Sequence, residues 1–231
     1  MDLPDAVPRQ LAFALDPPEN FSREDFLVGP GNAAALQLVE SWPNWPAHMV
    51  ALVGPEGSGK SHLAAIWAAA ARGYCLASRA LDEAAVPAAL SAGALVFECA
   101  GSNDLRDIDE RAMFHLLNLA QEQRAFLLIT ARTAPAGWPI GLPDLASRLR
   151  ALPVVTLAAP DDAMLRAILV KLFADRQLVV DDALISFLMV RIERSFAAAR
   201  AVVADLDREA LRQRRPVTRA LAGEILGSAA P

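Results

Sequence analysis

Short apolar runs alternate with helical stretches through the first two thirds of the chain. Five of these runs have the length of buried strands: residues 49–53, 73–77, 94–98, 126–131 and 154–157. Helical periodicity is clearest over residues 109–123, where Asp109 and Glu110 suit the positive end of a helix dipole. Strands that alternate with helices predict an α/β fold, with a parallel sheet sandwiched by helices.

The pattern changes at Asp161, and beyond it the apolar residues keep helical spacing over three segments. Thr218 is placed to cap a short fourth helix, and no strand pattern follows residue 157. Ahead of the first strand a helix fits residues 32–41, with Asn32 as its N-cap. We therefore predict three parts: an N-terminal arm at residues 1–20, an α/β domain at 21–158 and a small helical lid domain at 159–231.

Composition sets limits on function. Apolar residues make up 54% of the 231, ample for a core, and the net charge of −5 argues against a surface that is basic throughout. Residues 191–219 hold eight arginines against four acids, either a local patch for DNA or protein or, as we favour, a solvated helix face. Cys75 and Cys99 lie in apolar runs typical of buried thiols. With no apolar stretch that suits a membrane span or a secretory leader, we expect a soluble cytoplasmic protein.

The most informative local signal follows the first predicted strand. Residues 54–61 match the phosphate-loop pattern G-x-x-x-x-G-K-[ST] at every required position, and an apolar helical run comes next. In this pattern glycines turn backbone N–H groups onto phosphates, the lysine reaches the β- and γ-phosphates, and the hydroxyl ligates Mg²⁺. The alternative is a glycine-rich surface turn. The residues predicted to bind ATP or ADP are Gly54, Pro55, Glu56, Gly57, Ser58, Gly59, Lys60 and Ser61, with His62 next to them.

Four further segments carry a family resemblance: residues 21–35, 60–63, 127–130 and 145–149. Together they resemble the base-contacting box, the extended phosphate loop, the sensor 1 strand and the S-R-[FL] segment of the DnaA/Hda branch of AAA+ proteins. The resemblance implies the AAA+ module, with the adenine contacted by Phe26 and Val28, a sensor at Thr130 and a trans-acting arginine finger at Arg148. Taken alone, Thr130 also fits an ordinary strand threonine, and Arg148 fits a surface ion pair.

Residues 10–15 narrow the resemblance to the Hda type. Gln10, Leu11, Phe13 and Leu15 resemble the clamp-binding peptide Q-L-x-[LF]-x-L, in which the Gln amide binds a pocket rim and the apolar side chains enter clefts. The alternative is a first strand or a staple that packs on the sheet. The initiator's helix-turn-helix domain, which reads duplex DNA, and its N-terminal oligomerisation domain have no counterpart in this sequence, which strengthens the Hda-type resemblance.

Positions that this family uses for hydrolysis depart from its pattern. Glu98 stands where the family holds Mg²⁺ through water, so the resemblance implies a metal site of Ser61 and Glu98. Cys99 stands where a second acid orients the attacking water, and a thiol of pKa near ~8.5 replaces a carboxylate base poorly. Ala198 stands in place of the lid arginine that contacts the γ-phosphate, and Arg194, one turn earlier, is a partial substitute. The alternative is an alignment that is off by one turn.

We therefore expect a regulator whose own ATPase activity is weak or absent. It would bind the sliding clamp, hold ADP or ATP, and present Arg148 to an ATP-bound DnaA initiator. One alternative is an autonomous ATPase that acts as a loader or remodeller at replication origins, with Glu98 supporting turnover. Another is an interaction adaptor with a structural nucleotide. Self-association into a homo-oligomer also stays open.

Overall fold

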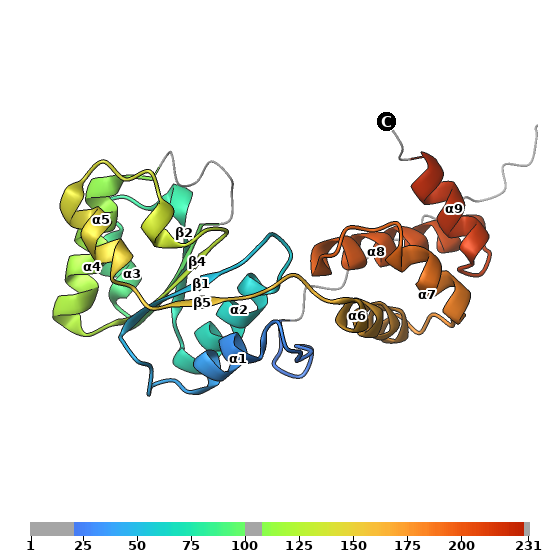
Figure 1. Cartoon of the computed structure of the whole chain (residues 1–231), viewed down its shortest axis with the longest axis horizontal. Helices are drawn as coiled ribbons and strands as arrows, with labels where there is room; N and C mark the ends of the chain where they lie inside the picture. The colour runs from blue at the N-terminus through green and yellow to red at the C-terminus, as the bar shows by residue number, and fades with distance from the viewer. Residues whose placement is uncertain (1–20, 100–107, 229–231) are drawn as a thin grey trace, which may run out of the picture.

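A computed structural model of the chain describes residues 21–99 and 108–228. Its strands form one parallel sheet in the order β2-β3-β4-β1-β5, which confirms the predicted fold (Figure 1). The strands are β1 (Met49–Val53), β2 (Tyr74–Ala77), β3 (Ala94–Glu98), β4 (Phe126–Ala131) and β5 (Val154–Thr156). Each predicted apolar run thus becomes a strand, with two ends moved by one residue.

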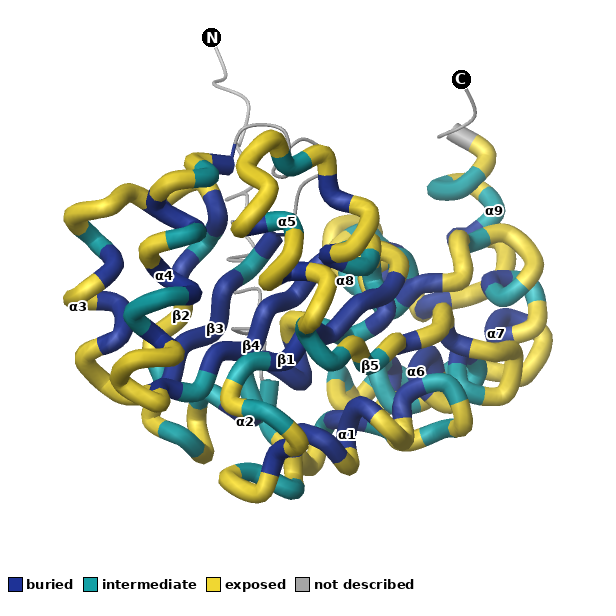
Figure 2. Tube along the Cα trace, turned by 60° about the vertical axis from the view of Figure 1, so that its left-hand side comes forward, coloured by how far each residue is buried: buried dark blue, intermediate teal, exposed yellow. Residues whose placement is uncertain are grey.

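Helices cover both faces of this sheet, and the three central strands β3, β4 and β1 are largely buried, whereas the outer strands β2 and β5 are more exposed (Figure 2). One face packs against α1 (Ala33–Glu40) and α2 (Lys60–Ala71), and the other against α3 (Val86–Leu90), α4 (Glu110–Gln123) and α5 (Pro143–Arg150). Side chains alternate along β1, so Leu52 joins the first cluster and Ala51 the second. Burial on both faces explains why the central strands read as continuous apolar runs.

The chain leaves the sheet after β5 and enters a bundle of four helices among the described residues (Figure 1). These are α6 (Asp162–Asp175), α7 (Asp182–Met189), α8 (Phe196–Gln213) and α9 (Arg219–Ser228). Leu165, Leu169, Phe173 and Leu206 are fully buried in the core of the bundle. Thr218 accepts a hydrogen bond from the Leu221 N–H at 3.4 Å, as expected of a cap.

Two local predictions need correction. Asn32 occupies the N-cap position of α1 as predicted, but its side chain forms no capping hydrogen bond: it accepts from the Gly29 N–H at 2.8 Å and donates to the Leu27 carbonyl at 2.9 Å. Cys75 is exposed, because β2 is the edge strand of the sheet, whereas Cys99 is buried as expected. No described helix is long and apolar enough to cross a membrane.

The arginine-rich stretch 191–219 occupies α8 and the turns beside it. Four of its arginines form ion pairs: Arg194–Asp162, Arg208–Asp205, Arg212–Glu209 and Arg215–Glu224. Arg191 and Arg219 both lie over the ring of Phe187. Neighbouring acids and rings thus dilute the charge, as on a solvated helix face.

Candidate functional site

The segment 54–61 forms a tight turn between β1 and the first turn of α2. Gly57 and Gly59 have φ angles of 67° and 96°, a region that other residues rarely adopt. A Cβ on Gly54 would lie 2.5 Å from the Leu157 carbonyl oxygen, so the loop also passes too close to its neighbour for a side chain. The strand, loop and helix that the motif requires are all present.

Lys60 curls back over this loop. Its Nζ donates to the carbonyl oxygens of Gly54 at 2.8 Å and Pro55 at 2.7 Å. Burial, reinforced by repulsion from Arg132, lowers the pKa of Lys60 from its usual value, although Glu56 opposes the effect. An anion in the loop would favour the charged ammonium and so oppose the effects of burial and of Arg132 on this pKa, as expected for a phosphate-binding lysine.

Ser58 supplies a second fit to a phosphate. Its hydroxyl is buried and, within the described part of the chain, has no hydrogen-bond partner. A buried polar group without a partner is costly, whereas a phosphate oxygen would satisfy it. Its place inside a glycine-rich turn explains the burial.

Arg132 is a site residue that was not predicted from the sequence. This residue follows β4, whose last residue, Ala131, accepts from the Gly54 N–H at 3.1 Å, so the end of β4 lies beside the start of the loop. Arg132 forms an ion pair with Glu56, which lies in the loop itself. The signal was present as a cation two residues after Thr130, but only the strand order brings it to the loop.

Glu98 and Thr130 lie at the edge of the sheet that is formed by the carboxyl ends of the strands, where the phosphate loop begins. They are register partners on β3 and β4, and Thr130 is in turn the partner of Leu52 near the end of β1. Thr130 is buried and Glu98 half-buried. Across the described residues no group of three or more His, Cys, Asp or Glu could hold a metal. A Mg²⁺ held by Ser61 and Glu98 would therefore depend on phosphate and water for its other ligands, as Mg²⁺ commonly does.

Cys99 lies on the side of the sheet that packs against α4. It is 2% exposed and lies in the cluster that contains Phe97, on the α4 side of the sheet. Its N–H donates to the Thr130 carbonyl at 2.9 Å, which continues the ladder beyond β3. A buried thiol on that face is not positioned to orient a water at the phosphate loop.

A small pocket of about 240 Å³ adjoins the loop. Its lining comes from the segments 29–32 and 158–161 together with Met164 of α6 and Phe196 of α8. This volume is below the ~300–1,000 Å³ of typical ligand pockets, so it suits a base better than a whole nucleotide. The pocket meets the loop at Phe196, whose ring would lie 3.3 Å from a Cβ on Gly59.

The predicted base-contacting residues lie around this pocket and do not line it. Phe26 is buried against His62, with ring centroids 5.2 Å apart, and Val28 is 50% exposed. His62 Nε2 lies 2.8 Å from the Ser22 carbonyl oxygen, and its ring also packs on Phe21. His62 thus fastens the segment before the pocket onto α2.

The N-terminus of α8 touches the phosphate loop. The Phe196 N–H donates to the Gly57 carbonyl at 2.9 Å, and Ser195 caps the helix by accepting from the Ala198 N–H at 3.0 Å. Ala198 therefore lies in the turn nearest the loop, where it offers no cation. Arg194 instead pairs with Asp162 at 2.9 Å, and Arg200 lies over the ring of Phe21.

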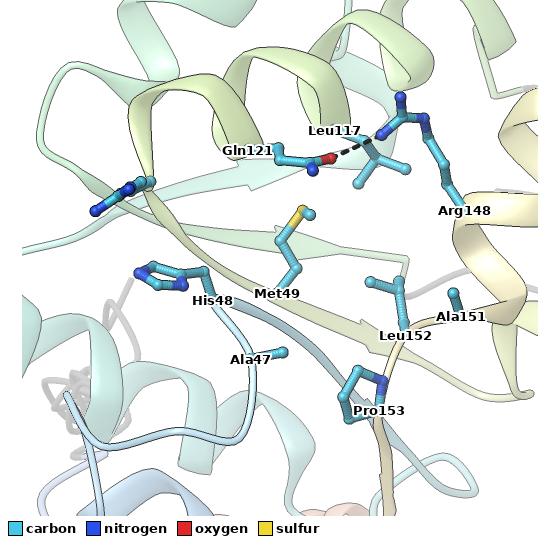
Figure 3. Close-up of a pocket in the computed structure, with 10 residues that line it drawn as sticks. Ala47, His48, Met49, Leu117, Gln121, Arg148, Ala151, Leu152 and Pro153 are labelled. Carbon is cyan, nitrogen blue, oxygen red and sulfur yellow. Dashed lines mark hydrogen bonds between the residues drawn. The ribbon is translucent and has the colours of Figure 1, made fainter.

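Arg148 lies at the opposite edge of the sheet, which is formed by the amino ends of the strands. It extends from α5 over a pocket bordered by the starts of β1 and β5, where it donates to Gln121 Oε1 at 2.8 Å (Figure 3). The pocket includes Met49, whereas the phosphate loop begins after Val53. At ~3.3 Å per residue the strand separates these edges by roughly 15 Å, so Arg148 does not reach its own loop.

Comparisons with solved structures place this arrangement. Domain III of the Thermotoga maritima replication initiation protein DnaA matches with a TM-score of 0.75 and 17% identity, over 91% of this chain and 97% of that one. AMPPCP-bound DnaA from Aquifex aeolicus matches with a TM-score of 0.66 and 18% identity, over 85% of this chain and 70% of that one. The Thermotoga maritima RuvB Holliday junction branch migration motor matches with a TM-score of 0.69 and 17% identity, over 90% of this chain and 71% of that one. The chain has the AAA+ fold. A scan against protein-family models gives no match.

Proposed function

We propose that this chain is a nucleotide-binding AAA+ regulator of DNA replication initiation, of the Hda type (HdaA), that stimulates ATP hydrolysis by the DnaA initiator. The observation that carries the proposal is the separation of Arg148 from the chain's own phosphate loop by the length of a strand. An arginine so placed suits the γ-phosphate of a neighbour. Supplied in trans, such an arginine contributes ~10³–10⁵ in rate.

The residues of the loop fit ADP or ATP. The loop N–H groups, Lys60 and the Ser58 hydroxyl would hold the phosphates, and the pocket at Met164 and Phe196 would take the base. Mg²⁺, held by Ser61 and through water by Glu98, would neutralise phosphate charge. Arg132 would exchange Glu56 for a phosphate oxygen, and the occupied loop would fix the N-terminus of α8.

Docking on the sliding clamp is part of the proposal and rests on the sequence. Gln10, Leu11, Phe13 and Leu15 lie outside the described residues. We expect the double substitution Gln10→Ala with Phe13→Ala to abolish clamp binding in a surface-binding assay. Unchanged affinity would remove the clamp from the proposal.

The proposed activity can be tested with a matched pair of arginines on α5. Arg148 extends over the pocket, whereas the exposed Arg150 donates from its Nε to the carbonyl of Ala146 on the same helix. With clamp on DNA and ATP-bound DnaA, the Arg148→Ala chain should lose the stimulation of ADP formation, and the Arg150→Ala chain should keep it. Normal stimulation by Arg148→Ala would defeat the assignment.

An autonomous ATPase is the second candidate. It is favoured by Glu98, which lies in register with Thr130 at the phosphate-loop edge, and opposed by the buried Cys99. Steady ATP turnover by the purified chain, abolished by Lys60→Ala, would support this second function over the first.

A further inference from the structure

The pocket at the Arg148 edge has a volume of about 420 Å³, within the ~300–1,000 Å³ range of ligand sites. Its floor is apolar: Leu117 is buried, and Met49 and Leu152 pack against the main core cluster. In Figure 3 the Met49 side chain points toward Leu117 and Gln121, with Leu152 beside it. An apolar group that enters here would continue the packing of the core.

Two guanidinium groups make the rim of this pocket cationic. They belong to Arg124 and Arg148, which line it together with His48, and none of the acidic residues that the structure describes does so. Within the part of the chain that the structure describes, none of these three forms an ion pair, and Arg148 bonds to the neutral amide of Gln121. His48 is held against the core by stacking on Phe126, at 4.8 Å between centroids.

Backbone geometry fixes Arg124 at the rim. It ends α4 in the left-handed region, at φ 54°, and its N–H donates to the carbonyls of Ala120 and Gln121. The side chain therefore starts from a fixed helix end at the rim. Its planar guanidinium can bind a carboxylate through two parallel hydrogen bonds.

We propose that this pocket binds a carboxylate carried on an apolar body, and that its occupant is an acidic residue beside a large apolar residue on the partner that receives Arg148. The apolar side chain fills the space above Leu117 and Met49, and the carboxylate meets Arg124. Pockets that a partner's apolar side chain fills in this way anchor interfaces. The identity of the partner rests on the proposed function, whereas the chemistry of the pocket does not.

A small probe tests the pocket by itself. N-acetyl-L-phenylalanine joins a carboxylate to an aromatic body, and its neutral amide is the matched control. With methyl-labelled methionine, NMR should show a saturable shift of Met49 with the acid, at least fivefold weaker binding of the amide, and no shift of Met164. An unmoved Met49 resonance, or equal binding of acid and amide, would overturn the proposal.

Arg124→Asn is the matching variant, because Asn tolerates the left-handed conformation but carries no charge. It should weaken the probe at least fivefold without changing the melting temperature. It should also weaken the directly measured affinity of ATP-bound DnaA for the chain about tenfold.

Once DnaA is saturating, its maximal hydrolysis rate should be unchanged, whereas Arg148→Ala lowers that rate. Probe binding lost with DnaA affinity intact would refute the proposed occupant. Failure of the chain to bind DnaA would refute the proposed function and this occupant, while the probe experiment still decides the chemistry of the pocket.

Discussion

The two edges of the sheet treat their cations differently. At the phosphate-loop edge, Lys60 is bonded to loop carbonyls and Arg132 to Glu56, so each has a partner within the chain. At the opposite edge, among the residues that the structure describes, Arg148 is bonded to neutral Gln121 and lies over Phe114. The first arrangement suits an anion that enters and displaces internal partners, whereas the second leaves a cation that transfers outward at little cost.

The largest expected effect is the loss of nucleotide binding on removal of the Lys60 side chain at the phosphate-loop edge. We expect Lys60→Ala to weaken ATP and ADP binding by about 100-fold, because the variant loses the charge that reaches the β- and γ-phosphates. Arg148→Ala should bind both nucleotides as the wild type does. Titration with a fluorescent nucleotide measures this, and a comparable loss in both variants would break the distinction between the edges.

The contact between the loop and α8 should be next in size. Gly57→Ala and Gly93→Ala both force alanine into a positive-φ conformation, at about 1–2 kcal/mol each. Only at Gly57 would the new Cβ meet a neighbour, Ser195 Cβ at 2.6 Å, because nothing lies within 4 Å at Gly93. In urea unfolding, Gly57→Ala should be the less stable variant, and only Gly57→Ala should lose nucleotide affinity. Equal stability and equal affinity would contradict a working contact.

The Arg132–Glu56 pair should give effects of opposite sign. Arg132→Gln should weaken ATP binding about tenfold, the loss expected for one hydrogen bond to a charged group. Glu56→Gln should strengthen ATP binding by a few-fold, because Arg132 no longer has an internal carboxylate to leave. Isothermal titration distinguishes them, and a loss in both variants would show that the pair only supports the loop.

The smallest effect concerns pH. Lys171 bridges Asp25 and Asp175, each at 2.7 Å, and so ties the segment before α1 to α6. The hydrogen bond that Lys171 donates lowers the pKa of Asp25 below 3.8, and the bonds that Lys171 donates to Asp175 and Asp25 raise the pKa of Lys171 above 10.5. The depressed carboxyl contributes stability above pH 3.8 that is lost as the pH falls through the folded pKa. The raised ammonium contributes stability below pH 10.5 that is lost as the pH rises through its folded pKa.

Lys171→Met should therefore cost about 1 kcal/mol at pH 7, and much of this cost should disappear once Asp25 is protonated. Thermal unfolding of both proteins at pH 7 and at low pH measures the difference. A cost that stays constant into acid would show that the pair contributes packing only.

The sequence predicted the central strands well because burial on both faces makes them continuous apolar runs, as along Met49–Val53. The exposure of Cys75 depends on β2 being at the edge of the sheet, and strand order is not written in local periodicity. In the same way, Arg132 and Glu56 lie 76 positions apart and meet only because β4 is adjacent to β1.

The site was predicted in part for the same reason. The loop motif is local, and its glycine conformations follow from its pattern. Phe196 and Met164 enter the base pocket from two helices of the lid, so no local signal marked them. Arg148 was selected by resemblance, but the basic rim with Arg124 required the parallel sheet to bring the starts of β1, β4 and β5 together.

The most direct test asks whose ATP is hydrolysed. DnaA loaded with γ-labelled ATP is mixed with clamp and with this chain carrying unlabelled nucleotide, and the label is then reversed. We predict rapid release of labelled phosphate, dependent on Arg148, when DnaA carries the label, and no comparable release when this chain carries it. Equal release from this chain alone, unaffected by Arg148→Ala, would contradict the division between the two edges.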